Sequence, residues 1–212
     1  MYISKVTLRE GFDKKNEFWR LGSEYTLHQA IWDLFSDGPD RKRDFIYRLE
    51  NIGKLPLIYA VSNRKPANSL WSIETKEYDP KIPCGARLGF ILRGNPTVKR
   101  EGKRHDVIMD YKKHRSNKPQ NTSNSESVQN IGRKWIESRS EKYGFHIEQV
   151  RVDGYRQNSF VKKNSVTEIR YSTLDFNGIV SIIHSGLFQK TLFNGIGAEK
   201  GFGCGLMLVK KI

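Results

Sequence analysis

The sequence has no pair of cysteines that could form a disulfide framework or a structural zinc site. Its 212 residues include only Cys84 and Cys204, which lie far apart and have no CxxC or CxxH companion. Both are expected to be small buried residues. Aspartate and glutamate occur singly, without the clustered carboxylates of a two-metal nuclease. The sequence therefore predicts no metal site and no cofactor.

Long apolar runs and excess negative charge are also missing. Charges at Lys5, Arg9 and Glu10 interrupt any signal-peptide core, and no later run reaches the ~20 apolar residues of a membrane span. We expect a soluble, cytoplasmic protein. The 37 Lys and Arg outnumber 23 Asp and Glu, which gives a formal charge of +14. This balance favours nucleic acid as partner over an anionic membrane, because no helix combines a basic face with a broad apolar face.

The sequence of the first half of the chain predicts one helix and several strands. A strand is expected over 2–8, and a helix with Ser23 as a candidate N-cap ends before Ser36. The apolar stripe of this helix has helical spacing and consists of Leu27, Ala30, Ile31, Leu34 and Phe35. The remaining strands, of which the first two form a hairpin, are predicted at 45–49, 55–61, 70–78 and 86–93.

The second half predicts the same order of elements. Residues 116–127 contain no apolar side chain and are expected to form a mobile loop. The later elements are a helix from Val128 to Tyr143, strands at 146–152 and 166–183 with an irregularity at Gly178, a helix at 186–194 capped by Ser185, and a strand at 206–212. The fold class is therefore α+β, with two tandem ferredoxin-like (RRM-like) βαββαβ domains at 1–95 and 96–212.

A glycine-rich segment, residues 195–205, resembles two nucleotide-binding motifs only superficially. A dinucleotide fingerprint follows a strand and opens a helix, whereas here a helix precedes and a strand follows. Lys200–Gly203 imitates the start of an aromatic RNA-binding strand, but Cys204 and Gly205 occupy the stacking positions. Two interpretations remain, a tight connector and a loop whose N–H groups follow an RNA backbone.

Basic residues are concentrated in two segments. Residues 99–115 carry seven Lys and Arg, and residues 151–170 carry five, with Arg156, Lys162 and Lys163 near the tip of a predicted hairpin. Such a hairpin can enter a groove of folded RNA and contact phosphates. A solvated charged hairpin is the simpler alternative.

One flank of the first helix carries the strongest candidate for chemistry. Tyr25, His28 and Trp32 are separated by three and four positions, so their side chains can converge on one ligand. A histidine beside a phenol can move protons at a phosphate. By pattern alone, a single helical histidine is more often structural or exposed.

Several short motifs together form a recognisable set. They are MYISKV, residues 25–29 with Trp32, Leu34 and Phe35, Arg43-Asp44-Phe45, Leu92-Arg93-Gly94-Asn95-Pro96, Gly102-Lys103-Arg104, and the glycine segment from Gly195 to Leu206. On these motifs the chain as a whole resembles the CRISPR repeat-RNA endoribonuclease of the type I-E Cascade complex, the CasE family. These matches run in order from one end to the other. The family junction usually reads Arg-Ala-Asn-Pro, and Gly94 is expected to change only local stiffness.

This resemblance implies tandem ferredoxin-like domains and cleavage of the CRISPR precursor transcript at the 3′ base of each repeat hairpin. The protein would then stay bound to the mature crRNA beside other Cascade subunits. The family's catalytic histidine falls on His28, and an assisting tyrosine falls on Tyr25. The residues expected to bind RNA are Arg156, Lys162, Lys163, Lys103, Arg104, Gly197, Lys200, Gly201 and Gly203.

The predicted chemistry needs no metal. The 2′-hydroxyl upstream of the scissile bond attacks its own phosphate, leaving a 2′,3′-cyclic phosphate and a 5′-hydroxyl, and a nearby Lys or Arg stabilises the added charge. Which of Tyr25 and His28 is acid and which is base stays open. Two other functions are also open, a non-catalytic RNA-hairpin-binding protein and a binder of double-stranded DNA.

Overall fold

The computed structural model describes residues 1–9, 24–35, 43–52, 55–115, 124–161 and 168–212. The chain divides into two compact units, each with one four-stranded sheet. Unit 1 comprises Met1–Asp79, Ser159–Ile169 and Gly201–Gly203. Unit 2 comprises Pro80–Asn158, Arg170–Lys200 and Cys204–Ile212.

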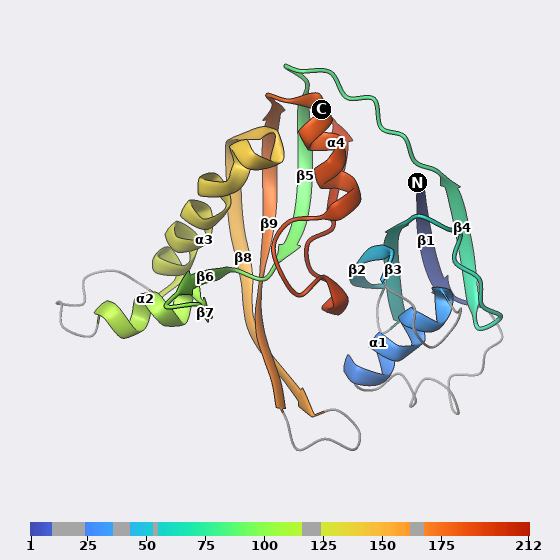
Figure 1. Cartoon of the computed structure of the whole chain (residues 1–212), viewed down its shortest axis with the longest axis horizontal. Helices are drawn as coiled ribbons and strands as arrows, with labels where there is room; N and C mark the ends of the chain where they lie inside the picture. Colours follow the sequence, from blue (N-terminus) through green and yellow to red (C-terminus); the bar gives the residue numbers. More distant parts are fainter. Residues whose placement is uncertain (10–23, 36–42, 53–54, 116–123, 162–167) are drawn as a thin grey trace. The chain divides into compact units, whose positions relative to one another are not determined.

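The sheet of unit 1 has the strand order β2-β3-β1-β4 (Figure 1). The strands are β1 (Tyr2–Leu8), β2 (Phe45–Ile52), β3 (Leu55–Ser62) and β4 (Trp71–Glu77). The central strand β1 is antiparallel to both β3 and β4, as in a ferredoxin-like sheet. Among the described residues, no helix joins β3 to β4, so this unit lacks the second helix of the predicted βαββαβ order.

One helix, α1 (Glu24–Trp32), followed by a 3₁₀ turn at Asp33–Phe35, packs on this sheet. The predicted apolar stripe is confirmed, because its members are buried or lie against the core. Phe35 stacks on Phe45 of β2 with ring centroids 4.2 Å apart, and Val6 and Ile58 are fully buried beneath the helix. The proposed N-cap, Ser23, lies outside the described residues. Periodic burial thus fixes which face of α1 meets the sheet.

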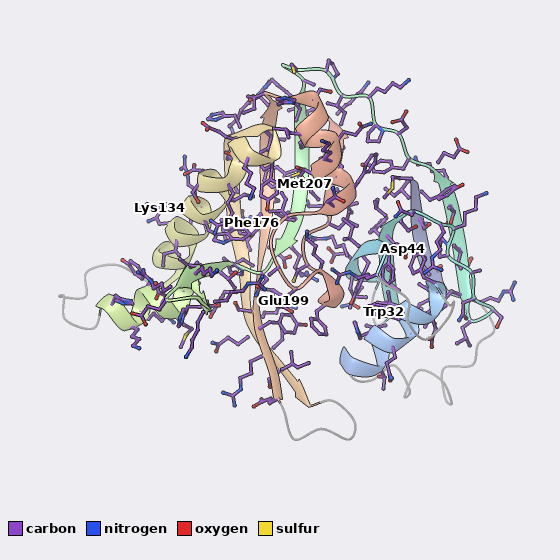
Figure 2. The ribbon with its side chains drawn as sticks, in the orientation of Figure 1. Trp32, Asp44, Lys134, Phe176, Glu199 and Met207 are labelled. Carbon is purple, nitrogen blue, oxygen red and sulfur yellow. The ribbon has the colours of Figure 1, made fainter. Side chains whose placement is uncertain are left out.

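The sheet of unit 2 has the order β10-β5-β9-β8, which is the ferredoxin-like arrangement. Its strands are β5 (Arg87–Gly94), β8 (Phe145–Val161), β9 (Glu168–Ile182) and β10 (Met207–Lys211), and its helices include α3 (Asn124–Ser140) and α4 (Ser185–Asn194). Trp135 of α3 stacks on Phe176 of β9, and Phe176 is labelled in Figure 2. Phe188 of α4 meets Phe145 of β8 edge to face. Aromatic contacts therefore join both helices to the sheet.

The strand β5 belongs to unit 2, although the sequence placed it at the end of a first domain closing near residue 95. Its alternating pattern fits either sheet, and only its pairing with β9 and β10 decides its place. The chain leaves the first unit at Asp79, so β5 begins the second ferredoxin-like unit. At its end, a methyl group on Gly94 would lie 3.3 Å from the Trp135 and Phe176 rings.

Unit 2 carries an additional hairpin and helix between β5 and α3 (Figure 1). These elements are β6 (Thr97–Arg100), β7 (Lys103–Asp106) and α2 (Val107–Arg115), and the sequence predicted none of them. Residues 116–123 of the predicted loop lie outside the described residues. Its last four residues, 124–127, already form the start of α3, which corrects the prediction that they are loop. Asn, Ser and Glu are common residue types at a helix start.

Two smaller predictions in unit 2 are corrected. The N-cap of α4 is His184 rather than Ser185, because the His184 ring accepts a hydrogen bond from the Leu187 N–H. Cys204 is buried as expected, but Cys84 is exposed. No helix in the described part of the chain is long and apolar enough to cross a membrane.

Gly178 permits the close approach of two strands in the second sheet. It pairs with Phe90 in unbroken register, and a Cβ built on it would lie 2.0 Å from the Gln149 carbonyl oxygen and 2.9 Å from the Val150 Cα. Both atoms belong to the backbone of β8, which cannot move without breaking the sheet. The predicted irregularity is therefore a site where only glycine fits.

We predict that Gly178→Ala lowers the free energy of unfolding by about 2–3 kcal/mol, because the methyl group overpacks β8. Urea unfolding followed by circular dichroism measures this change. Gly186→Ala is the matched control, because a Cβ there meets nothing closer than 3.8 Å. It should leave stability unchanged or raise it by less than about 1 kcal/mol. Equal effects of both substitutions would contradict the steric explanation.

Candidate functional site

The helix α1 holds His28 at the edge of the unit 1 core. His28 is half-buried, one step around the helix from the stripe that packs on the sheet. The Trp32 ring, one turn later and labelled in Figure 2, meets the imidazole edge to face with centroids 5.8 Å apart. The predicted approach of these two side chains is confirmed. The side chain of Tyr25 lies outside the described residues, although its backbone belongs to α1.

The imidazole is anchored by the glycine-rich segment. His28 Nδ1 lies 2.7 Å from the carbonyl oxygen of Gly201, 173 positions away in the sequence. A carbonyl oxygen only accepts hydrogen bonds, so Nδ1 carries the proton and donates. In the neutral ring Nε2 is consequently the basic nitrogen, and in the charged ring Nε2 is the second donor. The contact thus selects the nitrogen that can exchange a proton.

A second donor shares the same carbonyl oxygen. The Tyr47 hydroxyl, from β2, donates to Gly201 O at 2.7 Å, while its ring is buried in the unit 1 core. A carbonyl has two lone pairs, so both hydrogen bonds can form together. Tyr47 therefore helps to hold the Gly201 carbonyl in place, and that carbonyl orients the His28 ring. Sequence reasoning missed this residue, because within a strand it looks like an ordinary core position.

The backbone of the glycine segment must pass close to β2 to reach this position. Gly203 has a φ of +77°, and a Cβ on it would lie 3.2 Å from the Tyr47 ring. Both the left-handed backbone and the short contact favour glycine. The segment is tied at its ends within unit 2, where the Ile196 N–H donates to Gly205 O and the Gly205 N–H donates to Arg93 O.

Two aromatic rings, Trp32 and Phe202, contact the imidazole. The Phe202 ring lies 5.0 Å from it by centroids, with an interplanar angle of 33°. Trp32 in turn meets Phe45 at 5.4 Å. These contacts restrict the rotation of the His28 ring, because it cannot turn without displacing a neighbour. The imidazole is therefore held in one orientation by packing as well as by its hydrogen bond.

Arg43 is a further side chain at this site that sequence reasoning did not assign. It is exposed and lies two residues before β2 begins at Phe45. Its Nη1 lies 2.9 Å from the position that a Gly201 Cβ would occupy, and His28 Cε1 lies 3.8 Å from that position. Both side chains thus lie against the same glycine. The only sequence signal was that Arg43 belongs to one of the short motifs of the family resemblance.

The structure locates the other predicted RNA-binding residues within the two units. Lys103 and Arg104 are exposed on β7, and Arg156 is exposed on β8, all in unit 2. Lys162 and Lys163 lie outside the described residues. Gly201 and Gly203 join His28 in unit 1.

Two members of the glycine segment have contacts within unit 2 instead. The Gly197 N–H donates to the Tyr143 hydroxyl at 3.4 Å, and a Cβ on Gly197 would lie 3.5 Å from the Trp135 ring. The Lys200 stem lies 3.2 Å from the corresponding position at Gly205. Binding of RNA by these residues stays a prediction.

Cations gather on the added hairpin and helix of unit 2. Besides Lys103 and Arg104, the exposed basic side chains there are Lys99, Arg100, Lys112 and Lys113. Hydrogen bonding from Arg100 lowers the pKa of Asp110 below its ordinary value. A second carboxylate, Asp106, accepts from the Met109 N–H at 2.7 Å just before α2 begins. Two acidic residues of this region, Asp106 and Asp110, therefore have local partners, while the exposed Lys and Arg side chains outnumber the acidic ones.

Within the described residues, no three or more His, Cys, Asp or Glu side chains gather in a way that could hold a metal ion.

Comparisons with known proteins show which proteins this chain is similar to. The chain is 27% identical to the CRISPR system Cascade subunit CasE of Escherichia coli (strain K12), over 98% of both chains. A structure of the CRISPR endoribonuclease Cse3 bound to a 19 nt RNA superposes with a TM-score of 0.74 at 20% identity, covering 99% of this chain and 100% of that one. The crystal structure of Cas6e from Escherichia coli K-12 gives 0.68 at 22% identity, with both chains fully covered.

At these identities the structural likeness shows the shared fold, and it confirms the prediction of tandem ferredoxin-like domains. The resemblance to the CasE family is confirmed as well. A family model described as CRISPR associated protein matches residues 1–211. Because this match spans nearly the whole chain, the protein belongs to the family of CRISPR associated proteins.

Proposed function

We propose that the protein is an endoribonuclease that cuts the CRISPR precursor transcript at the 3′ base of each repeat hairpin. The observation that carries this proposal is the hydrogen bond from His28 Nδ1 to the Gly201 carbonyl, which leaves Nε2 to exchange a proton. The names of its relatives support it, since one is an endoribonuclease bound to RNA and another is a Cascade subunit. After cleavage the protein stays on the mature crRNA as a Cascade subunit.

The reaction is an internal transesterification. The 2′-oxygen of the upstream nucleotide attacks the adjacent phosphorus, and the bond from phosphorus to the 5′-oxygen breaks. The 2′-hydroxyl loses its proton and the departing 5′-oxygen gains one, so the products are a 2′,3′-cyclic phosphate and a 5′-hydroxyl. His28, in its charged form, delivers the second proton from Nε2 and becomes neutral, while Tyr25 positions the nucleophile and, as the phenolate, takes up the first proton. This chemistry requires proton donors and acceptors and no metal ion.

Unit 2 supplies the affinity for the repeat hairpin. Lys103, Arg104 and Arg156 present exposed charges. Lys162 and Lys163, which lie outside the described residues, are proposed to add further phosphate contacts. Such contacts to phosphates position an RNA stem without reading its bases. The exposed Lys112 and Lys113 of α2 add to the positive surface. The Lys200 side chain and the backbone of Gly197, Gly201 and Gly203 contact the RNA backbone.

The first test replaces the proton donor. We predict that His28→Ala abolishes cleavage of a labelled repeat hairpin from the protein's own source, with a rate loss of at least about 100-fold, because the leaving oxygen then receives no proton. Binding measured by gel shift should change little. His146→Ala, at an exposed histidine of β8, serves as the control and should cleave normally. An unaltered product profile with His28→Ala would favour the non-catalytic RNA-binding protein instead.

The second test addresses the nucleophile and the metal. Cleavage should persist in excess EDTA and stop when the upstream nucleotide is 2′-deoxy, because the attacking oxygen is then missing. Mass analysis of the product ends should find the cyclic phosphate. Loss of cleavage in EDTA would contradict the metal-free mechanism. Competition by duplex DNA of the same sequence tests the remaining alternative, and the RNA hairpin should win.

The third test examines the support of the Gly201 carbonyl. Tyr47→Phe removes one of its two donors, and a neutral hydrogen bond contributes about 0.5–1.5 kcal/mol, so the single-turnover rate should fall about 2- to 10-fold. The matched control is Tyr59→Phe on the neighbouring strand β3, which should leave the rate unchanged. If both variants cleave at the wild-type rate, Tyr47 does not position His28 through the carbonyl.

A further inference from the structure

Arg43 and His28 approach one residue from two different elements. Arg43 precedes the edge strand β2, His28 projects from α1, and both lie against Gly201 of the glycine segment. The contacts are the 2.9 Å and 3.8 Å separations of Arg43 Nη1 and His28 Cε1 from the position of a Gly201 Cβ. All three residues belong to unit 1. A guanidinium therefore lies close to the imidazole that is proposed to exchange protons.

The charge of Arg43 is not neutralised within the described part of the chain. The adjacent carboxylate, Asp44, pairs with Arg64, with Oδ2 2.9 Å from the Arg64 Nε. No ion pair or hydrogen bond joins Arg43 to another described residue, and its side chain is exposed. An exposed arginine with uncommitted donors can bind an incoming anion through several N–H groups at once.

We propose that Arg43 is a further catalytic residue, which contacts the non-bridging oxygens of the scissile phosphate and stabilises the charge that develops there. The inference rests on the proposed function, because it assigns a residue to the same reaction. Attack by the 2′-oxygen places additional negative charge on those oxygens before the 5′-oxygen departs. A cation positioned at this point binds the transition state more strongly than the ground state.

Gly201 gives this proposal an independent probe. Its φ is not among the positive values of the segment, so the backbone there does not require glycine. Glycine at position 201 instead leaves room for the Arg43 guanidinium. A methyl group there would displace the guanidinium, whereas its distance to the His28 ring would be an ordinary van der Waals contact. Gly201→Ala should therefore disturb Arg43 and spare the hydrogen bond to the imidazole.

The primary experiment measures single-turnover cleavage at saturating protein, together with the dissociation constant for an uncleavable 2′-deoxy hairpin. Arg43→Gln should lower the rate by about 100-fold. The dissociation constant should rise much less, because one phosphate contact contributes only part of the binding. Lys76→Gln removes the same charge at an exposed position on β4, the opposite edge strand, and should leave the rate unchanged.

Two further variants should have cleavage rates between those of the wild type and Arg43→Gln. Arg43→Lys keeps the charge but loses the planar fork, so its rate should fall between wild type and Arg43→Gln. The cleavage rate of Gly201→Ala should also lie between those of the wild type and Arg43→Gln. A wild-type rate for Arg43→Gln, or a rate loss matched by the loss of binding, would overturn this inference while leaving the proposed function standing. Failure of the wild-type protein to cleave the hairpin would instead overturn the proposed function.

Discussion

The hydrogen bond from His28 to the Gly201 carbonyl is the constraint on which the candidate site depends. It selects the imidazole nitrogen that can exchange a proton, and it joins positions 173 residues apart. To make it, the chain leaves unit 2 after Lys200, contributes three residues to unit 1 and returns at Cys204. This path favours glycine at position 203, since a Cβ there would lie 3.2 Å from the Tyr47 ring, closer than ordinary van der Waals contact.

Packing makes the hydrogen bond effective. Two aromatic rings restrict the imidazole, and one of them, Trp32, packs on Phe45, which stacks on Phe35 in the core. The apolar stripe of α1 holds the helix on the sheet, so the position of His28 is an outcome of core formation. A side chain ordered in this way loses little further entropy when it binds a phosphate, which favours catalysis by proton transfer.

Local patterns predicted most strands and helices of the two ferredoxin-like units but missed β6, β7 and α2, and long-range pairing explains the errors in sheet assignment and at the site. The periodicity from Leu27 to Phe35 identified α1 and its buried face, because burial repeats with the helical turn. The same kind of pattern could not assign β5 to a sheet, since alternation does not reveal the partner strand. Tyr47 and Arg43 escaped notice because their roles arise from contact with Gly201, more than 150 positions later in the sequence. His28 itself was identified mainly through the family resemblance.

The net charge of +14 predicts a polyanionic partner, but local pairing decides which cations can act in chemistry. In unit 1 two carboxylates in or next to β2 are paired, Asp44 with Arg64 and Glu50 with Arg48. The charges of the arginines in those pairs are balanced, whereas no carboxylate among the described residues pairs with Arg43, which lies near His28. In unit 2 the exposed His114 also has its Nδ1 2.7 Å from a backbone carbonyl, but that carbonyl belongs to Asp110 of the same helix, four positions earlier in the sequence. Under the proposed function, affinity for RNA and the capacity to cut it depend on different cations, since binding draws on total charge and catalysis on a charge held at one phosphate.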